Sequence, residues 1–185
     1  TDDHLWIFLP EEKVLYTGDL FIWAAPNCGN PQKAQRYPRE WAMALRKMAN
    51  LGATTLLPGH GPVILGADRI RLALSETAEL LETILEQTLA LMNQGACLDE
   101  VLHGVTLPEA LLARPYLRPV YDDPRFIIRN LWRLYGGWYD GNPAHLLPAP
   151  AIDLAKTLSE LAGGTGNLLA RAEREAENER LDIAC

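Results

Sequence analysis

The chain has 185 residues, 48% of them hydrophobic, which is enough for one ordinary domain with a packed core. A formal net charge of −7 without a clustered basic stripe excludes a nucleic-acid partner, because phosphates require concentrated Lys and Arg. No run of about 18 apolar residues is present, so we expect no membrane span, and the opening TDDHLWIF lacks the pattern of a signal peptide.

The first third of the chain has an α/β pattern. Residues 4–9 and 13–17 are short apolar runs separated by a turn, which predicts a β-hairpin. A loop rich in Pro, Asn and Gly follows. The stretch 38–49 then has helical periodicity, with proline at its start and Gly52 beyond its end. The segment ATTLLPGHGP predicts a further strand that closes in a glycine-rich turn.

The rest of the chain is predicted to be helical. Between Asp68 and Gly95 the apolar residues keep a 3.6-residue period, which predicts one helix roughly 39 Å long. Shorter helices are expected near residues 98–104, 107–113, 124–135, 151–162 and 167–181. We therefore place a boundary between an α/β part, residues 1–66, and an all-α part, residues 67–185.

Two short motifs in the α/β part carry chemistry. TGD (residues 17–19) ends one expected strand and PGHGP (residues 58–62) ends another. Glycine lets the backbone turn away at a strand end, so that Asp19 and His60 could meet at one sheet edge. There the carboxylate could bridge two cations and the imidazole could bind one of them. Alternatively, Asp19 caps a turn and His60 binds a loop carbonyl.

These motifs and the downstream sequence together resemble one protein family. TGD after a strand, a helix, and a strand closing in PGHGP resemble the last two metal-binding motifs of the metallo-β-lactamase superfamily. The stretches ETILEQTLALMNQG, RNLWRLYGGWYDGNPAHLLP and DLAKTLSELAGG resemble the dimerisation domain of its alkyl sulfatase branch, and GWYDGNPAHL is the most specific part. The implied architecture is the C-terminal part of an αββα metallo-β-lactamase sandwich followed by a helical dimerisation domain.

The resemblance implies roles for two residues and leaves others outside the chain. Asp19 corresponds to the bridging carboxylate and His60 to the final histidine ligand of a site with two zinc ions. The HxHxDH motif of the superfamily is not in this sequence, and a third ligand position would fall at or just before Thr1. Adjacent strand residues point to opposite faces, so Asp2, Asp3 and His4 do not form a ligand cluster, and His4 is interpreted as structural.

Candidates for anchoring an anionic substrate are Arg36 and Tyr37, in the loop after Asp19, and Tyr135 in the YGGWYDG segment, with Arg133 as a weaker candidate. The alternative is that Tyr135 belongs to the core and Arg36 faces solvent. His103 and His145 are interpreted as structural. The same holds for the three widely spaced cysteines, although Cys28 lies in the loop near the expected metal site and thiolate is a good zinc ligand.

Two accounts of function follow. In the first, the chain is part of a di-zinc hydrolase that cleaves an alkyl sulfate or related small anionic ester with metal-activated water. The family's sulfatases carry glutamate where this chain has Asp19, so a hydrolase of another ester class is an alternative. Alone, residues 1–185 are expected to be inactive. In the second, the chain is a non-catalytic homodimerisation module.

The predicted homodimer rests on the long apolar stripe between Asp68 and Gly95. Shorter helices of the same chain cannot cover it fully, so a second copy is expected to bury more than about 1,000 Å² in total around this helix. Leu81 and Leu85 are expected at the centre of that interface.

Overall fold

The computed structural model describes residues 4–185, and Asp2 and Asp3 lie outside them. The chain forms two compact units, which divide after Gly141: the second unit is Asn142–Cys185. The boundary near residue 66 between an α/β part and an all-α part stays a prediction, because the sheet before it and the helices that follow it as far as Gly141 belong to one packed unit.

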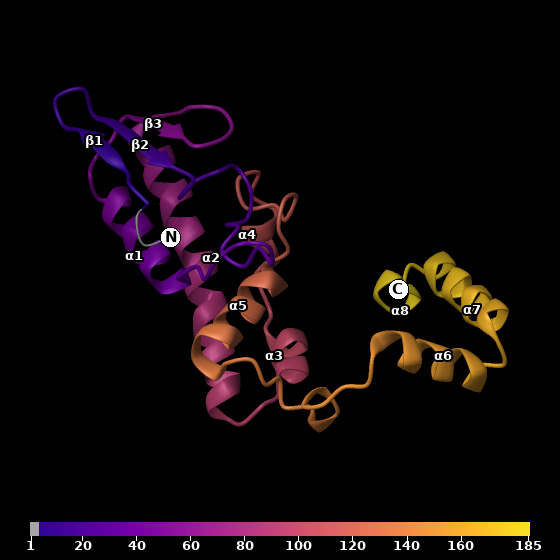
Figure 1. Ribbon diagram of the computed structural model, residues 1–185. Helices are drawn as coiled ribbons and strands as arrows, with labels where there is room; N and C mark the ends of the chain where they lie inside the picture. Colours follow the sequence, from indigo (N-terminus) through magenta and orange to yellow (C-terminus); the bar gives the residue numbers. More distant parts are fainter. Residues whose placement is uncertain (1–3) are drawn as a thin grey trace. The chain divides into compact units, whose positions relative to one another are not determined.

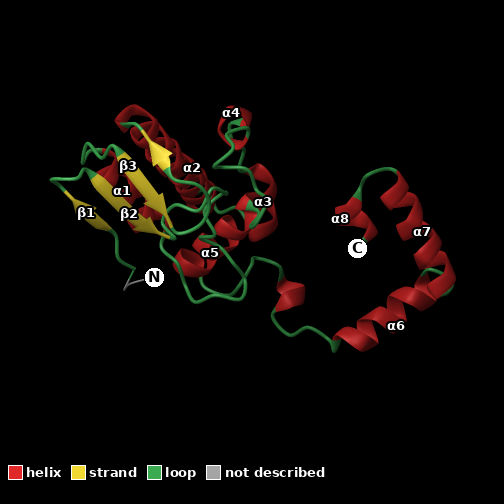
Figure 2. Cartoon of the chain, turned by 90° about the horizontal axis from the view of Figure 1, so that it is seen from above, coloured by secondary structure: helices red, strands yellow, loops and turns green. Residues whose placement is uncertain are grey.

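The first unit contains one small mixed sheet. Its four strands are β1 (Ile7–Leu9), β2 (Val14–Gly18), β3 (Thr55–Pro58) and β4 (Ile64–Leu65), in the order β1-β2-β3-β4. β1 and β2 form the expected antiparallel hairpin, β2 and β3 are parallel, and β4 runs antiparallel to β3. The strands lie side by side next to helices α1 and α2 (Figures 1 and 2). The carboxyl ends of β2 and β3 consequently meet at one edge.

The two faces of this sheet differ in burial. Leu15, Leu56 and Ile64 are paired across the strands and belong to the hydrophobic core. On the opposite face, the neighbouring positions Ile7, Tyr16 and Leu65 are 56%, 42% and 62% exposed. Alternating strand residues point to opposite faces, so the sheet packs on helices with one face only.

The long helix of the first unit forms with nearly its expected bounds. α1 (Pro38–Ala49) begins with a proline, which is tolerated in a first turn, and its Trp41, Leu45 and Met48 face the core. α2 (Ala67–Asn93) packs along α1. A two-pronged hydrogen bond joins the pair, since Arg46 Nε and Nη2 lie 3.1 and 2.5 Å from the two carboxylate oxygens of Glu82.

The predicted role of α2 at the centre of a dimer interface is wrong in one respect. Leu81 and Leu85 are 0% and 7% exposed within this single chain. α1 covers one side of α2 and α5 (Pro124–Gly136) another, with Ile127 and Leu131 of α5 fully buried. The chain's own helices therefore cover the apolar stripe, and Leu81 and Leu85 are core residues.

The remaining helices are short. The first unit also contains α3 (Leu98–Gly104) and α4 (Glu109–Leu112). The second unit contains η1 (Pro143–His145), α6 (Ala151–Leu161), α7 (Thr165–Glu177) and α8 (Leu181–Ala184). Among the described residues of this unit, only Glu175 is buried, at 3% exposed. None of the helices over residues 4–185 is long and apolar enough to cross a bilayer.

Candidate metal and anion site

Asp19 and His60 meet at the edge where β2 and β3 end. Gly18 pairs with Pro58 across the parallel strands, so the residues that follow each strand leave the sheet at the same level. His60 Nε2 lies 3.3 Å from Asp19 Oδ1. The convergence predicted from the two motifs is confirmed. The spacing is shorter than the roughly 5–7 Å expected for two ligands of a dinuclear site, because the imidazole and the carboxylate contact each other directly.

The environment of Gly59 explains why the PGHGP motif needs glycine at this position. Its backbone N–H donates to Gly18 O at 2.9 Å, which ties the two strand ends together. A Cβ at position 59 would lie 2.2 Å from Asp19 Oδ1 and 2.8 Å from Asp19 N, far inside contact distance. Only glycine permits the PGHGP turn to approach the TGD turn this closely. The close approach sets the distance between Asp19 and His60.

The Asp19–His60 pair offers part of a donor set for zinc. A carboxylate oxygen and an imidazole nitrogen are both zinc ligands, and the two side chains are half-exposed or more, at 53% and 73%. Across residues 4–185, no group of three or more His, Cys, Asp or Glu side chains gathers as a metal site would require. The pair therefore fits part of a zinc site and not a complete one.

Cys28 does not extend this donor set. Its side chain is fully buried, and burial raises the pKa of the thiol to about 12, against weaker lowering by Arg36. Over residues 4–185 this thiol also belongs to no group of three or more side chains that could hold a metal ion. The interpretation of Cys28 as an ordinary core thiol agrees with this environment.

A cavity of about 470 Å³ opens beside the Asp19–His60 pair. Two cationic side chains line it together with aliphatic and aromatic ones. The full lining is Asp19, Ile22, Trp23, Ala24, Asn27, Lys33, Arg36, His60, Val120 and Tyr121. Cations beside an apolar wall suit a ligand with an anionic head and a hydrocarbon part.

Arg36 is the predicted anchoring residue that the structure brings to this cavity. Its Nη1 donates to both the backbone and the side-chain oxygen of Asn27, each at 2.6 Å. Asn27 is itself 7% exposed. A buried amide thus fixes one end of the guanidinium, and Arg36 is a positioned side chain, contrary to the alternative of one that merely faces solvent.

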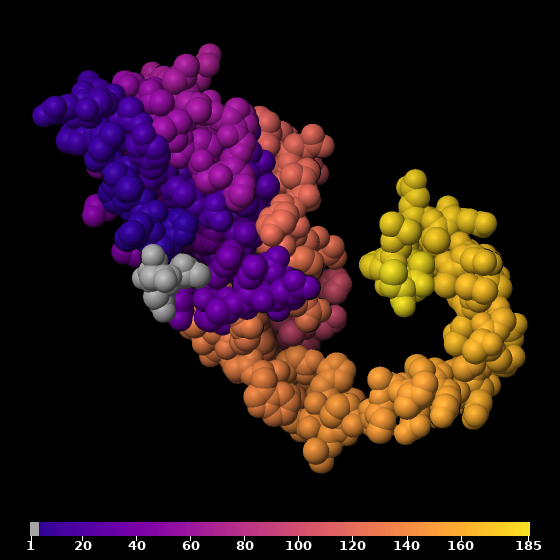
Figure 3. Space-filling view, turned by 45° about the horizontal axis from the view of Figure 1, so that its top comes forward, coloured from indigo at the N-terminus to yellow at the C-terminus, as the bar shows by residue number. Residues whose placement is uncertain are grey.

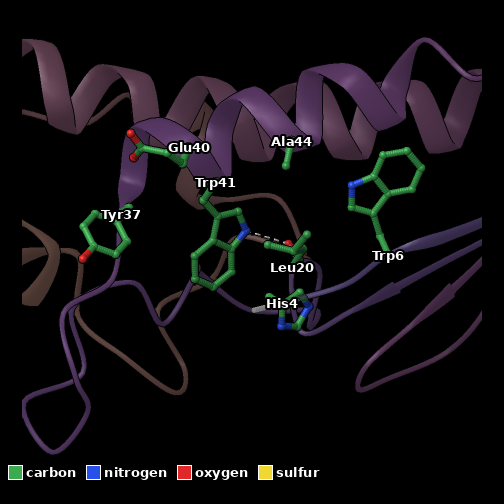
Figure 4. Close-up of a pocket in the computed structure, with 7 residues that line it drawn as sticks. All are labelled: His4, Trp6, Leu20, Tyr37, Glu40, Trp41 and Ala44. Carbon is green, nitrogen blue, oxygen red and sulfur yellow. Dashed lines mark hydrogen bonds between the residues drawn. The ribbon is translucent and has the colours of Figure 1, made fainter. Parts of the chain in front are cut away.

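Tyr37 lies in a different cavity. Figure 4 shows its ring beside α1, in a space of about 410 Å³ that Asp19 and His60 do not line. The lining residues are His4, Trp6, Leu20, Tyr37, Glu40, Trp41 and Ala44. His4 Nε2 lies 3.3 Å from Thr17 O, which agrees with its structural interpretation.

The structure does not place Tyr135, Arg133 or the other histidines in the cavity beside Asp19. Tyr135 is 48% exposed in the last turn of α5. Arg133 donates to Gln35 Oε1 at 2.9 Å and to Asn130 Oδ1 at 3.0 Å. His103 Nδ1 contacts Asp99 O within α3 at 3.0 Å. His145 Nε2 lies 3.4 Å from Asn142 Nδ2 within the local turn.

Residues of the helical part form one wall of the cavity beside Asp19 and His60, and the sequence did not indicate them. Val120 and Tyr121 line the cavity, about 100 positions after Asp19 in the sequence. No local sequence motif indicates that they belong to a site. A hydrogen bond from Ala25 N to Arg118 O at 3.1 Å joins their segment to the loop after β2. This contact between distant segments completes the cavity.

A buried polar cluster supports this wall. Glu76 of α2, 8% exposed, accepts from Arg114 Nε and Nη2 at 3.1 and 2.6 Å and from the Tyr116 hydroxyl. Burial and the bond to Glu76 raise the pKa of Tyr116. The Tyr116 ring centroid lies 5.9 Å from that of Phe21 and 6.1 Å from that of Trp23. The cluster therefore anchors the segment that precedes Val120 onto α2.

Comparison with known proteins gives the family. Residues 97–185 match the alkyl sulfatase dimerisation family. The linear primary-alkylsulfatase of Pseudomonas sp. strain ATCC 19151 is 30% identical over 175 residues, which are 92% of this chain and 33% of that protein. The chain is a homologue of the alkylsulfatases. The alkylsulfatases belong to the metallo-β-lactamase superfamily, so the predicted resemblance is confirmed.

Further relatives agree with this assignment. The (R)-specific secondary-alkylsulfatase of Pseudomonas sp. is 33% identical over 168 residues, 88% of this chain and 25% of that protein. The structure of the stereoselective inverting sec-alkylsulfatase Pisa1 from Pseudomonas sp. superposes with a TM-score of 0.84 at 30% identity, covering 97% of this chain and 29% of that one. The chain thus spans about a third or less of these alkylsulfatases, and its small mixed sheet and helices match one part of their fold.

Proposed function

We propose that this chain is part of a zinc-dependent hydrolase that cleaves alkyl sulfates or related small anionic esters. The observation that carries the proposal is the convergence of Asp19 and His60, 3.3 Å apart, at a cavity that also contains Lys33 and Arg36. Homology to alkylsulfatases supports the reaction class, because two Pseudomonas relatives are named alkylsulfatases and a Saccharomyces cerevisiae relative is named an alkyl/aryl-sulfatase.

Different residues of the cavity have different proposed roles. Asp19 and His60 would hold zinc, which when bound supplies an activated water and polarises the ester. Lys33 and Arg36 would bind the anionic group, and the fork of Arg36 is suited to two oxygens at once. Ile22 and Val120 would contact the hydrocarbon part of the substrate.

The proposal includes two classes of substrate, sulfate esters and other anionic esters. Aspartate has a shorter arm than the glutamate of the resembling sulfatases, so Asp19 alters the spacing available to metal ions. A hydrolase of another anionic ester is therefore the alternative. Comparing hydrolysis of an alkyl sulfate with that of the matching alkyl phosphate by the whole protein distinguishes the two.

The exposed sheet face supports a finer architectural proposal. Ile7, Tyr16 and Leu65 form an uncovered apolar surface on a sheet whose other face is packed. A second sheet laid on this surface would complete an αββα sandwich, as two sheets bury their apolar faces against each other.

Zinc titration of residues 1–185 tests the metal proposal. Two protein ligands give weaker binding than the three or four of ordinary zinc sites, so we expect weak binding and no esterase or sulfatase turnover by this chain alone. In calorimetry, His60→Ala and Asp19→Asn should each abolish the site, whereas His103→Ala, a control at an exposed helix position, should not. Zinc binding that ignores His60, or turnover that a chelator stops, would contradict the proposed donor set.

A second proposed function is homodimerisation, and one observation favours it. The second unit has an amphipathic α6 whose Leu154, Leu158 and Leu161 are 53%, 51% and 80% exposed. These positions lie at helical spacing and so form one stripe. The unit belongs to the stretch that matches the dimerisation family. A second copy of the chain is the occupant that we propose for this stripe.

A further inference from the structure

The loop between β2 and α1 is seated directly on α5. A Cβ added to Gly29 would lie 2.0 Å from Phe126 C and 2.2 Å from Ile127 N, so the loop and the first turn of the helix touch backbone to backbone. In Figure 3 the purple loop lies against the orange surface of α5. This contact joins the part of the chain that contains Asp19 to the stretch that matches the dimerisation family.

Asn130 is the polar residue that fixes this contact. It is 6% exposed in the middle of α5, where its neighbours Ile127, Ile128 and Leu131 are apolar and buried. Its side-chain Nδ2 donates to the backbone oxygen of Arg36 at 2.7 Å. A buried amide in an apolar helix face is costly unless it is hydrogen-bonded, so the bond to Arg36 is a specific constraint.

Gln35 reinforces the same carbonyl. Its Nε2 donates to Arg36 O at 3.0 Å and to Asn130 O at 3.3 Å. Arg133 closes the cluster by donating to the side-chain oxygens of both Gln35 and Asn130. The backbone of Arg36 is therefore held by α5, while Asn27 holds Nη1 of its guanidinium. The two hydrogen bonds from the Arg36 side chain to Asn27 both use Nη1, and the side chain lines the cavity beside Asp19 and His60.

We propose that Asn130 is a positioning residue that holds Arg36 at the cavity, so that α5, from the dimerisation-family region, sets the affinity of the site for anions. The inference rests on the proposed function, since it assumes that Arg36 binds the anionic group of the substrate. Asn130 does not contact the cavity itself and acts only through Arg36. It follows that the effect of Asn130 on anion binding requires the Arg36 guanidinium.

A double-mutant cycle with inorganic sulfate as the probe tests this. The chain with residues 1–185 is titrated with sulfate, and affinity is measured from the NMR shift of the Trp23 indole N–H, which belongs to a residue of the cavity wall. The variants are Arg36→Ala, Asn130→Ala and the double variant. Arg129→Ala is the matched control, one position away on α5 and exposed. Gln35→Ala removes the second donor at a half-buried position and serves if Asn130→Ala does not fold.

We expect Asn130→Ala to weaken sulfate binding about tenfold, because the Arg36 carbonyl loses its shorter, buried hydrogen bond and keeps only the one from Gln35 Nε2, so that the segment can shift. Gln35→Ala should weaken it by a few-fold, and Arg129→Ala should leave it unchanged. In the Arg36→Ala background neither change should have a further effect. Equal loss from Asn130→Ala in both backgrounds, or no loss in either, would overturn the positioning role. Sulfate binding that is indifferent to Arg36→Ala would instead remove the proposed anion site.

Discussion

At the scale of single residues, two adjacent aspartates have opposite environments. Asp122 is 5% exposed; its Oδ1 accepts from Asn30 Nδ2 at 3.2 Å, and within the described chain its Oδ2 has no hydrogen-bond partner. Burial raises the pKa of Asp122 above 3.8. Asp123 caps α5, and its hydrogen bonds to Arg125 lower the pKa of that carboxyl. The neighbours therefore contribute to stability with opposite dependence on pH.

Asparagine substitutions make this difference measurable. A raised folded-state pKa means that stability is full below about pH 3.8 and falls as pH rises through the raised value. Asp122→Asn should thus unfold about 2–4 °C higher than the wild type at pH 7, a gain of about 1 kcal/mol that disappears in acid. Asp123→Asn should unfold at a lower temperature at pH 7 and converge on the wild type in acid. Thermal unfolding followed by circular dichroism at pH 7 and in acid measures the change in unfolding temperature for each variant. The same pH dependence for both variants would contradict the opposite pKa shifts of Asp122 and Asp123.

The sequence alone identified some residues of the candidate site and not others, for a physical reason. Asp19 and His60 follow strand ends with glycine neighbours, which is a local signal that can be read along the chain. Asn130 contacts Arg36, which lies 94 positions earlier, and Tyr121 lines the same cavity as Asp19, about 100 positions earlier. Hydrophobic periodicity places Asn130 on a helix without indicating that the helix packs on a loop, so its partner could be found only from the three-dimensional structure.

At the scale of elements, periodicity predicted which segments fold but not what covers them. The apolar stripe of α2 was correctly expected to need a partner, and that partner is the pair α1 and α5. A stripe has the same pattern whether it packs on its own chain or on a second one. The prediction that the chain's own helices are too short to cover α2 left α1 out. α1 lies along α2 and is joined to it by the hydrogen bonds between Arg46 and Glu82.

Aspartate substitutions on α2 test this assignment directly. Leu81 is fully buried, whereas Leu72 on the same helix is 49% exposed. Leu81→Asp should cost several kcal/mol, because a carboxylate would be buried without a partner, and should unfold the first unit. Leu72→Asp should stay within about 0.5 kcal/mol of the wild type. Chemical denaturation followed by circular dichroism measures both. A folded, monomeric Leu81→Asp chain would restore the original view that Leu81 belongs to an interface between subunits.

At the scale of the whole molecule, the two compact units differ in how they bury apolar surface. The first has a continuous core of leucine, isoleucine and aromatic side chains from the sheet and from α1, α2 and α5. The second has apolar side chains on three helices and none of them buried within the unit. Helices with exposed apolar stripes are marginal in water, since most helical stability comes from tertiary packing. The second unit therefore has the composition of a segment that is stabilised by association.

The exposed apolar stripe of α6 is the surface through which we expect two copies of the chain to associate. If a second copy covers the stripe of Leu154, Leu158 and Leu161, the wild-type chain should be a dimer in light scattering at tens of micromolar. Leu154→Asp with Leu158→Asp should give monomers, because two desolvated carboxylates in an apolar contact cost several kcal/mol. Lys156→Asp makes the same net charge change as that pair on the opposite face of α6 and should leave the dimer intact. The first unit should keep its thermal transition in all three chains, since these residues lie outside its core. A wild-type monomer would contradict the homodimer, and a double variant that stays dimeric would show that a surface other than α6 joins the subunits.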